Sequence, residues 1–354
     1  MTARDPILKL VTDWQVELTD KEASSRLSVI LENLRYLERT KFNSYLPTRY
    51  SRHPATFSER FYRWLTNPSL TSAQQRDLFE FAYHIAFFSF DDFAALFQSA
   101  FSGPICRWCM SQAGLRMDQP DWQTKLDEER FDLTWFCPVT DSLLISVFHH
   151  VNEIEGKNRK PAFSDLKHLG DENSDIEKNK IHKHIRAKKY RRLVLLEDFV
   201  GTGGQSFKTV EWAVRTLRIP VLFCPMIICP EGAAKYRDLQ ATIRREQAAN
   251  PDLPDFDFIP VFEMSGDCFV HSADNSPESL FMRICTLAEE IHTRLSESQQ
   301  HCKEGPLGYW NEDSPQKGAT VVMFSNTPNN SLPLLHHSAE SWSPLFPRVA
   351  RHPL

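Results

Sequence analysis

Residues 192–207 read RLVLLEDFVGTGGQSF, a pattern typical of a strand, a turn and a helix in succession. Only 12 glycines occur in 354 residues, yet three of them fall within positions 201–204. Glycine lets the backbone approach a ligand closely, and a turn that opens a helix presents N–H groups and the positive end of the helix dipole. We therefore predict a phosphate-binding turn made of Gly201, Thr202, Gly203, Gly204, Gln205 and Ser206.

Two acids, Glu197 and Asp198, stand directly before this turn. Carboxylates accept hydrogen bonds from ribose hydroxyls and supply oxygen ligands to Mg2+. Because side chains alternate along a strand, both acids reach one ligand only where the strand end turns. We predict that Glu197 and Asp198 form the catalytic centre of a sugar-phosphate site, and that Asp198 also takes a share of a Mg2+ ion.

Strands and helices alternate from about Phe131 onward. This alternation predicts an α/β fold, a mainly parallel sheet with flanking helices, preceded by a helical N-terminal domain. Ligands of such sheets bind outside the carboxyl ends of the strands, which singles out the loops after Cys137 and Phe199. The strands are expected at 131–137, 193–199, 221–228, 258–262 and 319–324, and the helices at 142–154, 205–217, 232–247 and 277–295.

The first part of the chain is expected to be helical. Thr19 with Glu22, and Thr71 with Gln74, have the spacing of a capping box. A phenylalanine-rich stretch over 87–101 has two interpretations, core packing or a surface for a protein partner, and its helical spacing favours the core. The predicted domains are 1–127 (helical), 128–300 (α/β) and 301–354 (a strand and a Pro/Asn-rich segment that packs on the α/β domain).

A polar, basic segment lies between the first two predicted strands, at 157–192. It reads either as a solvated surface loop or as a flap that closes over an anionic substrate. Its second half, KNKIHKHIRAKKYRR at 178–192, also raises contact with RNA or DNA. Basic runs without interleaved aromatic residues are usually solvated faces, so nucleic-acid binding is the weaker interpretation.

Composition excludes several classes of protein. The formal net charge of −5 argues against a globally basic nucleic-acid binder. The longest apolar stretch, 219–230, is interrupted by proline and is shorter than a membrane helix, so no membrane span is expected. Charges near the N-terminus do not fit a signal peptide, and eight scattered cysteines fit reduced thiols, so we expect a cytoplasmic protein. The CxxC of Cys106 and Cys109 lacks a partner pair at zinc-site spacing and is expected to be structural.

The stretch 194–204 resembles the ribose-5-phosphate loop of the type I phosphoribosyltransferase fold. It differs from a P-loop because no lysine follows the glycines, and from a dinucleotide fingerprint because the acids precede them. The resemblance implies binding of phosphoribosyl pyrophosphate (PRPP) or a nucleotide with Mg2+. Gln205 stands where the family often has threonine, so one phosphate hydroxyl is missing unless Ser206 or Lys208 replaces it.

The resemblance also implies a pyrophosphate loop after the strand at 131–137. There the chain continues as Pro138-Val139-Thr140-Asp141-Ser142, although Asp141 or Ser142 serving as a plain helix cap explains the motif nearly as well. The basic segment falls where the family carries a flexible catalytic loop. The pyrophosphate-binding residues implied in this way are Thr140, Asp141, Ser142, Arg186 and Lys188.

Two C-terminal motifs, NTPNNSLP at 326–333 and PLFPR at 344–348, lie outside the ordinary metabolic enzymes of this fold. With the N-terminal helices they resemble phosphoribosyltransferase-like effectors of bacterial antiviral conflict operons. That resemblance implies a transferase that releases pyrophosphate, and the retained acid pair favours an enzyme. The alternatives are an inactive nucleotide sensor or partner-binding subunit, and an effector that binds nucleic acid.

Overall fold

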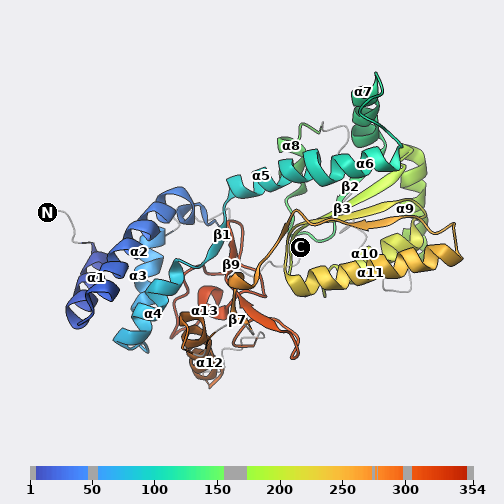
Figure 1. Cartoon of the computed structure of the whole chain (residues 1–354). Coiled ribbons are helices and arrows are strands. Elements are labelled where there is room, and N and C mark those ends of the chain that lie inside the picture. The colour runs from blue at the N-terminus through green and yellow to red at the C-terminus, as the bar shows by residue number, and fades with distance from the viewer. Residues whose placement is uncertain are drawn as a thin grey trace. The chain divides into compact units, whose positions relative to one another are not determined.

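The computed structural model describes residues 5–46, 55–154, 174–272, 276, 278–297 and 305–348 (Figure 1). The chain divides into two compact units, of which unit 1 comprises Met1–Asp91 with Gly266–Leu354 and unit 2 comprises Asp92–Ser265. Unit 1 therefore combines both ends of the sequence, whereas unit 2 is continuous. The domain limits predicted at 127 and 300 stay predictions.

Unit 1 begins with four helices whose first turns are capped by side chains. Thr71 and Gln74 form the predicted capping box. The box predicted at Thr19 is wrong, because the neighbouring Asp20 is the cap and accepts a hydrogen bond from the N–H of Glu22 at 2.9 Å. Either side chain satisfies the same free N–H groups, so the helix starts where expected. The four helices are α1 (Pro6–Glu17), α2 (Lys21–Thr40), α3 (Phe57–Leu65) and α4 (Ser72–Ala82).

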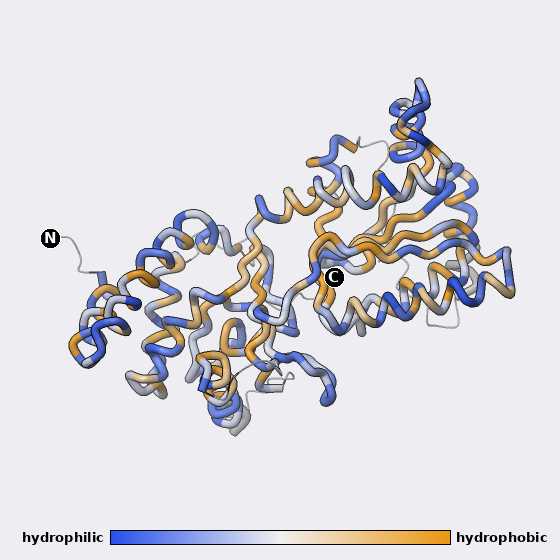
Figure 2. Tube along the Cα trace, viewed as in Figure 1, coloured by the Kyte–Doolittle hydropathy of each residue, from blue (hydrophilic) through white to orange (hydrophobic). Residues whose placement is uncertain are grey.

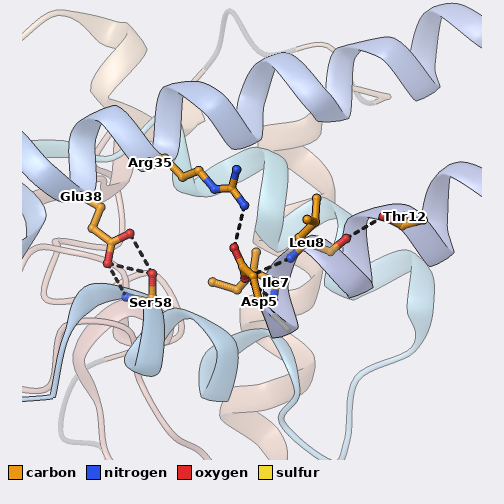
Figure 3. A network of polar contacts seen from close by, with 7 residues as sticks. All are labelled: Asp5, Ile7, Leu8, Thr12, Arg35, Glu38 and Ser58. Carbon is orange, nitrogen blue, oxygen red and sulfur yellow. Dashed lines mark hydrogen bonds and ion pairs between the residues drawn. The ribbon is translucent and has the colours of Figure 1, made fainter. Parts of the chain in front are cut away.

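Polar contacts from α2 tie the starts of α1 and α3 together (Figure 3). Asp5 caps α1, and Arg35 of α2 donates to its carboxylate at 2.6 Å. One turn further along α2, Glu38 accepts hydrogen bonds from the N–H and the hydroxyl of Ser58, at 3.1 and 2.7 Å. The N-terminal helices are therefore joined by side chains as well as by their apolar faces.

The C-terminal half of unit 1 shares a core with these helices. Strand β1 (Ala86–Phe88) pairs in parallel with β9 (Val321–Met323), and β7 (Phe269–Ser272) pairs antiparallel with β8 (Gln316–Ala319). The predicted strand at 319–324 thus has its partner in the N-terminal part of the chain, because an apolar pattern specifies that a face is buried but not which segment covers it. The helices of this half are α12 (Leu280–Glu297) and α13 (Pro333–His336). Buried residues of this shared core include Trp64, Leu78, Val270, Leu332, Leu335 and Phe346.

Unit 2 is built around the predicted parallel sheet, which confirms the α/β class. The strand order is β2-β3-β4-β5, β6 also pairs with β4, and every pairing is parallel. The two central strands are almost wholly buried, and Figure 2 shows these strands as the most continuously hydrophobic part of the unit. The strands are β2 (Thr134–Pro138), β3 (Arg192–Val200), β4 (Val221–Ile228), β5 (Phe256–Phe258) and β6 (Phe262–Glu263).

Helices cover both faces of this sheet (Figure 1). Leu193 and Leu195 of β3 share a core with α9, α10 and α11, while Phe136 of β2 packs against Phe101 and Phe148 on the other face. Phe93 and Phe97 are buried as well, so the phenylalanine-rich stretch packs mainly in cores; a protein partner for the N-terminal helices stays a prediction. The helices of this unit are α5 (Phe90–Ala100), α6 (Cys106–Gln112), α7 (Trp122–Asp127), α8 (Ile145–Val151), α9 (Ser174–Lys188), α10 (Phe207–Thr216) and α11 (Pro230–Ala249).

The predicted strand at 258–262 is split into β5 and β6. Pro260 lies between the two and has no N–H to donate to a neighbouring strand. On the facing strand, Pro225 accepts a hydrogen bond from the N–H of Val261 at 3.0 Å but, as a proline, returns none. The two prolines account for the interruption of the sheet here.

Within the described ranges, no helix has the length and apolar character that crossing a membrane requires.

Candidate functional site

The loop after β2 lies beside the carboxyl end of β3. Pro138 is opposite Leu196 in the parallel register, and the N–H of Val139 donates to the carbonyl of Leu196 at 2.9 Å. The pairing brings the next residues of the loop to the two acids that follow Leu196. Residues that are more than fifty positions apart in the sequence therefore form one polar cluster.

Glu197 is the centre of this cluster and is only 3% exposed. Its Oε2 accepts a hydrogen bond from the N–H of Thr140 at 3.0 Å, and its Oε1 accepts from the hydroxyls of Thr140 and Ser142 at 2.5 and 3.1 Å. Burial raises the pKa of Glu197 well above its ordinary value, and the charge of Asp198 raises this pKa further, while the three hydrogen bonds oppose the shift. Glu197 therefore holds a proton more readily than an exposed glutamate does.

Asp198 reaches the same loop, which an ideal strand would not allow for adjacent residues. Its Oδ1 accepts hydrogen bonds from the hydroxyl of Ser142 and from the N–H of Phe199, both at 2.8 Å. The β3–β4 register pairs Glu197 and Phe199 with residues of β4 but not Asp198, so the ladder is interrupted at this residue. Both carboxylates contact the Ser142 hydroxyl, at 3.1 Å for Glu197 and 2.8 Å for Asp198.

The glycine turn follows at the end of β3. Gly203 has φ 76°, a left-handed conformation that residues with a Cβ rarely adopt. A Cβ on Gly232, in the first turn of α11, would overlap the carbonyl oxygen of Gly201, so these two backbones need glycine to approach each other. In the described part of the chain the N–H groups of 202–206 take no intramolecular hydrogen bond, and that of Phe207 donates to the carbonyl of Gly203 at 3.0 Å. Free N–H groups at the start of a helix, here the ten-residue α10, are donors of the kind that bind anions in other proteins.

Two residues of α11, Tyr236 and Lys235, support this turn. The Tyr236 hydroxyl and the Ser206 hydroxyl are 2.6 Å apart, and both side chains are buried. Burial raises the pKa of Tyr236 above its ordinary value, so the phenol stays protonated. The Nζ of Lys235 lies 4.5 Å from the ring centroid of Phe207, which places a cation beside the turn. Neither residue was predicted from the sequence, because a buried aromatic residue next to a lysine is ordinary in an amphipathic helix.

The members of the predicted phosphate turn differ in exposure. Gly204 and Gln205 are exposed, Thr202 is half-buried, and the Ser206 side chain is turned inward to Tyr236. Asp141 is exposed at the tip of the β2 loop. The alternative in which Asp141 or Ser142 caps a helix is wrong, because α8 begins at Ile145 with Leu144 in the capping position and no side-chain cap.

Arg186 and Lys188 do not join this cluster. They lie in the last turn of α9, which ends four residues before β3 begins. Glu197 is the sixth residue of β3, so at about 3.3 Å per residue the strand carries the chain roughly 17 Å away from that end of the sheet. The prediction that they lie with the acids at a pyrophosphate site is therefore wrong. Arg186 and Lys188 are exposed at the amino edge of the sheet, whereas the acids lie at its carboxyl edge. The part of the predicted flap at 157–173 lies outside the described residues.

The cluster fits a Mg2+ ion only together with a ligand. No group of three or more histidine, cysteine or acidic side chains suited to a metal occurs among the described residues. Mg2+ in proteins is often held by one or two carboxylates, with water and substrate phosphates supplying the other ligands. Asp198 suits that role better than Glu197, both of whose oxygens accept hydrogen bonds and whose pKa is raised. In the part of the chain that the structure describes, Cys106 and Cys109 do not belong to such a group.

A comparison with protein families assigns the chain. The family model PRTase-CE matches residues 61–348. The chain belongs to the PRTase-CE family. Neither a curated protein nor a solved structure shows a significant match to it.

Membership confirms the resemblance drawn from the sequence: this is a phosphoribosyltransferase-like protein. The match extends beyond the predicted α/β domain at 128–300, which contains the stretch that resembles the ordinary enzymes. It includes the second half of α3, all of α4 and the C-terminal motifs at 326–333 and 344–348, so members of PRTase-CE share elements of both compact units.

Proposed function

We propose that the carboxyl edge of the unit 2 sheet binds a phosphoribosyl ligand, either PRPP or a nucleotide. The observation that carries the proposal is the hydrogen-bonded cluster of Glu197, Asp198, Thr140 and Ser142 beside a glycine turn with free N–H groups. One part accepts hydroxyl groups and the other accepts an anion. A ribose phosphate carries both groups at a fixed separation.

The turn at 201–206 would take the 5-phosphate. Its N–H groups and the dipole of α10 favour negative charge, and the hydroxyl of the half-buried Thr202 adds a donor. Lys235 supplies the cation that the turn itself lacks. The hydrogen bond between the Ser206 and Tyr236 hydroxyls joins the end of the turn to α11.

Glu197 and Asp198 would hold the ribose hydroxyls, and Asp198 would share a Mg2+ ion with the ligand's oxygens. When bound, Mg2+ offsets the negative charge of a pyrophosphate. A transfer reaction would displace pyrophosphate at the anomeric carbon, with these residues holding the sugar in position. The alternative is a sensor that binds the same ligand without transfer.

Calorimetry with PRPP, with and without Mg2+, tests binding. We expect Mg2+-dependent binding that is lost in a Glu197→Ala, Asp198→Ala double variant. The matched control replaces Asp238 and Asp252, two exposed acids of the same unit, by alanine and so removes the same number of carboxyl groups. Absence of PRPP and nucleotide binding to the wild type contradicts the proposal. Pyrophosphate release when bases or nucleic acids are added separates an enzyme from a sensor.

The biological setting we propose is defence against viruses. Support comes from the C-terminal motifs, which the PRTase-CE match includes. Bacteria carrying the gene should survive phage infection better than bacteria carrying the Glu197→Ala, Asp198→Ala variant at equal protein level. Equal survival of the two strains contradicts a defence role that depends on this site.

A further inference from the structure

The two hydroxyls that contact the acid pair are themselves close together. Thr140 Oγ1 and Ser142 Oγ are 2.6 Å apart, one contacts Glu197 at 2.5 Å, and the other contacts Asp198 at 2.8 Å. This separation is similar to that of hydroxyl oxygens on neighbouring carbons of a furanose ring. The two neighbouring hydroxyls therefore contact the two neighbouring carboxylates in the way that the diol of a ribose would contact the same acids.

We propose that Thr140 and Ser142 form an internal substitute for the vicinal diol of the ligand, and that binding displaces them from the acids. The inference rests on the proposed function, because it concerns how the same acids exchange one diol for another. It names the ligand class more narrowly, as phosphates of sugars that carry a vicinal diol, so a ribose phosphate is selected over a 2-deoxyribose phosphate.

The exchange conserves most hydrogen bonds at the acids. The hydroxyls of Thr140 and Ser142 leave, and two ligand hydroxyls take their places, so Glu197 Oε1 and Asp198 Oδ1 each keep a hydroxyl donor. Without this substitute, Glu197 and Asp198 would stand side by side with no hydroxyl partner from the β2 loop. The internal diol therefore stabilises the acid pair while the ligand is absent.

One hydrogen bond is not replaced in the exchange. The N–H of Thr140 donates to Glu197 Oε2 at 3.0 Å, and a diol bound at Oε1 and Asp198 does not supply this donor. On displacement, the N–H and hydroxyl of Thr140 and the hydroxyl of Ser142 become free to bind an anion. The same loop can then serve the pyrophosphate, as the family resemblance implies, after it has left the acids.

The rival arrangement is a permanent support, in which Thr140 and Ser142 orient the acids while the ligand binds elsewhere on them. Removing the hydroxyls separates the two arrangements. Since a closed loop reduces apparent affinity by the fraction of open molecules, a Thr140→Val, Ser142→Ala variant should bind ribose 5-phosphate about tenfold more tightly than the wild type. A permanent support requires weaker binding in this variant. Ribose 5-phosphate is the probe because it has no pyrophosphate to contact the loop.

The control is a Thr242→Val, Ser111→Ala variant, which removes two hydroxyls of the same types from helices of unit 2. It should bind ribose 5-phosphate as the wild type does. 2-Deoxyribose 5-phosphate should bind the wild type more weakly, and its affinity should change less in the Thr140→Val, Ser142→Ala variant. Equal gains for the two sugars overturn the diol assignment.

A second measurement covers the case in which the double variant does not fold. Ribose 5-phosphate should accelerate hydrogen exchange at the Thr140 amide of the wild type, while the Val139 amide, bonded to the Leu196 carbonyl, stays protected. Unchanged or slower exchange at Thr140 overturns the displacement and leaves the proposed function intact. If neither ribose 5-phosphate nor PRPP binds the wild type, both the proposed function and this inference fail.

Discussion

Replacing Gly203 by alanine should destabilise unit 2 through the glycine turn. At φ 76° a residue with a Cβ pays about 1–2 kcal/mol. The new Cβ would lie 3.3 Å from Cε2 of Tyr236. The Tyr236 ring has little room to move, because its centroid is 4.5 Å from that of Phe223 and its hydroxyl is hydrogen-bonded to Ser206. Alanine also restricts the unfolded chain, which returns about 0.4–1 kcal/mol. Crowding against Tyr236 roughly offsets that return, so the free energy of unfolding should fall by about 1–2 kcal/mol.

Gly204 is the matched control within the same turn. Its φ is not in the left-handed region, and a Cβ there would meet only Thr202 Oγ1 at 3.7 Å, an ordinary contact. Gly204→Ala should leave the free energy of unfolding unchanged or raise it by up to about 1 kcal/mol, since only the unfolded chain is restricted.

Amide hydrogen exchange on β3 and β4 reports the opening of unit 2 separately from unit 1. Because about 1.4 kcal/mol corresponds to a tenfold change, Gly203→Ala should speed the slowest of these amides by roughly five- to thirtyfold. Gly204→Ala should leave them unchanged or slower. Equal exchange in the two variants would refute the argument from φ and from the Tyr236 contact.

Three further changes have defined outcomes. Burial lowers the pKa of His336 to about 3, so below about pH 6.5 the unfolded chain takes up a proton that the folded chain does not. From pH 7 to 5, the free energy of unfolding of the wild type should fall by about 2 kcal/mol more than that of His336→Gln in paired urea titrations. Parallel pH profiles of the two proteins would contradict this. Glu129 is 2.6 Å from Arg192, whose side chain is 5% exposed, so Glu129→Gln leaves a buried charge without its ion-pair partner. The free energy of unfolding should fall by about 3 kcal/mol. A fall below about 1 kcal/mol would mean that the pair is effectively solvated. Tyr236→Phe leaves the buried Ser206 hydroxyl without this partner and should lower the free energy of unfolding by about 1–3 kcal/mol. Adding Ser206→Ala should recover part of that loss. Strictly additive losses would exclude coupling between the two residues.

Much of unit 2 was predictable because its signals are local. An apolar run such as 221–228 corresponds residue for residue to β4, and the run at 193–199 lies within β3. The glycine turn and the helix after it are also short-range features. The split of the strand predicted at 258–262 has a cause in the sequence, Pro260, since a residue without an N–H is poorly suited to a strand.

The candidate site was only partly predictable, because it depends on which distant segments meet. Glu197 and Asp198 were identified from their neighbours in sequence, but their bonds to Thr140 and Ser142 follow from the register of β2 against β3. Arg186 was assigned to the site from its place in the chain, and the direction of β3 carries the acids away from it. Tyr236 and Lys235 gave no signal at all.

Local sequence patterns specify the parallel α/β unit and a glycine turn directly after an acid pair, because strand, turn and helix propensities act over a few residues. Two features depend on long-range contacts: the β2 loop presents two hydroxyls to the acids, and the C-terminal segment completes the core of the first helices. Strand pairing and core packing join residues far apart in the chain, and a local pattern shows that a face is buried without naming what covers it.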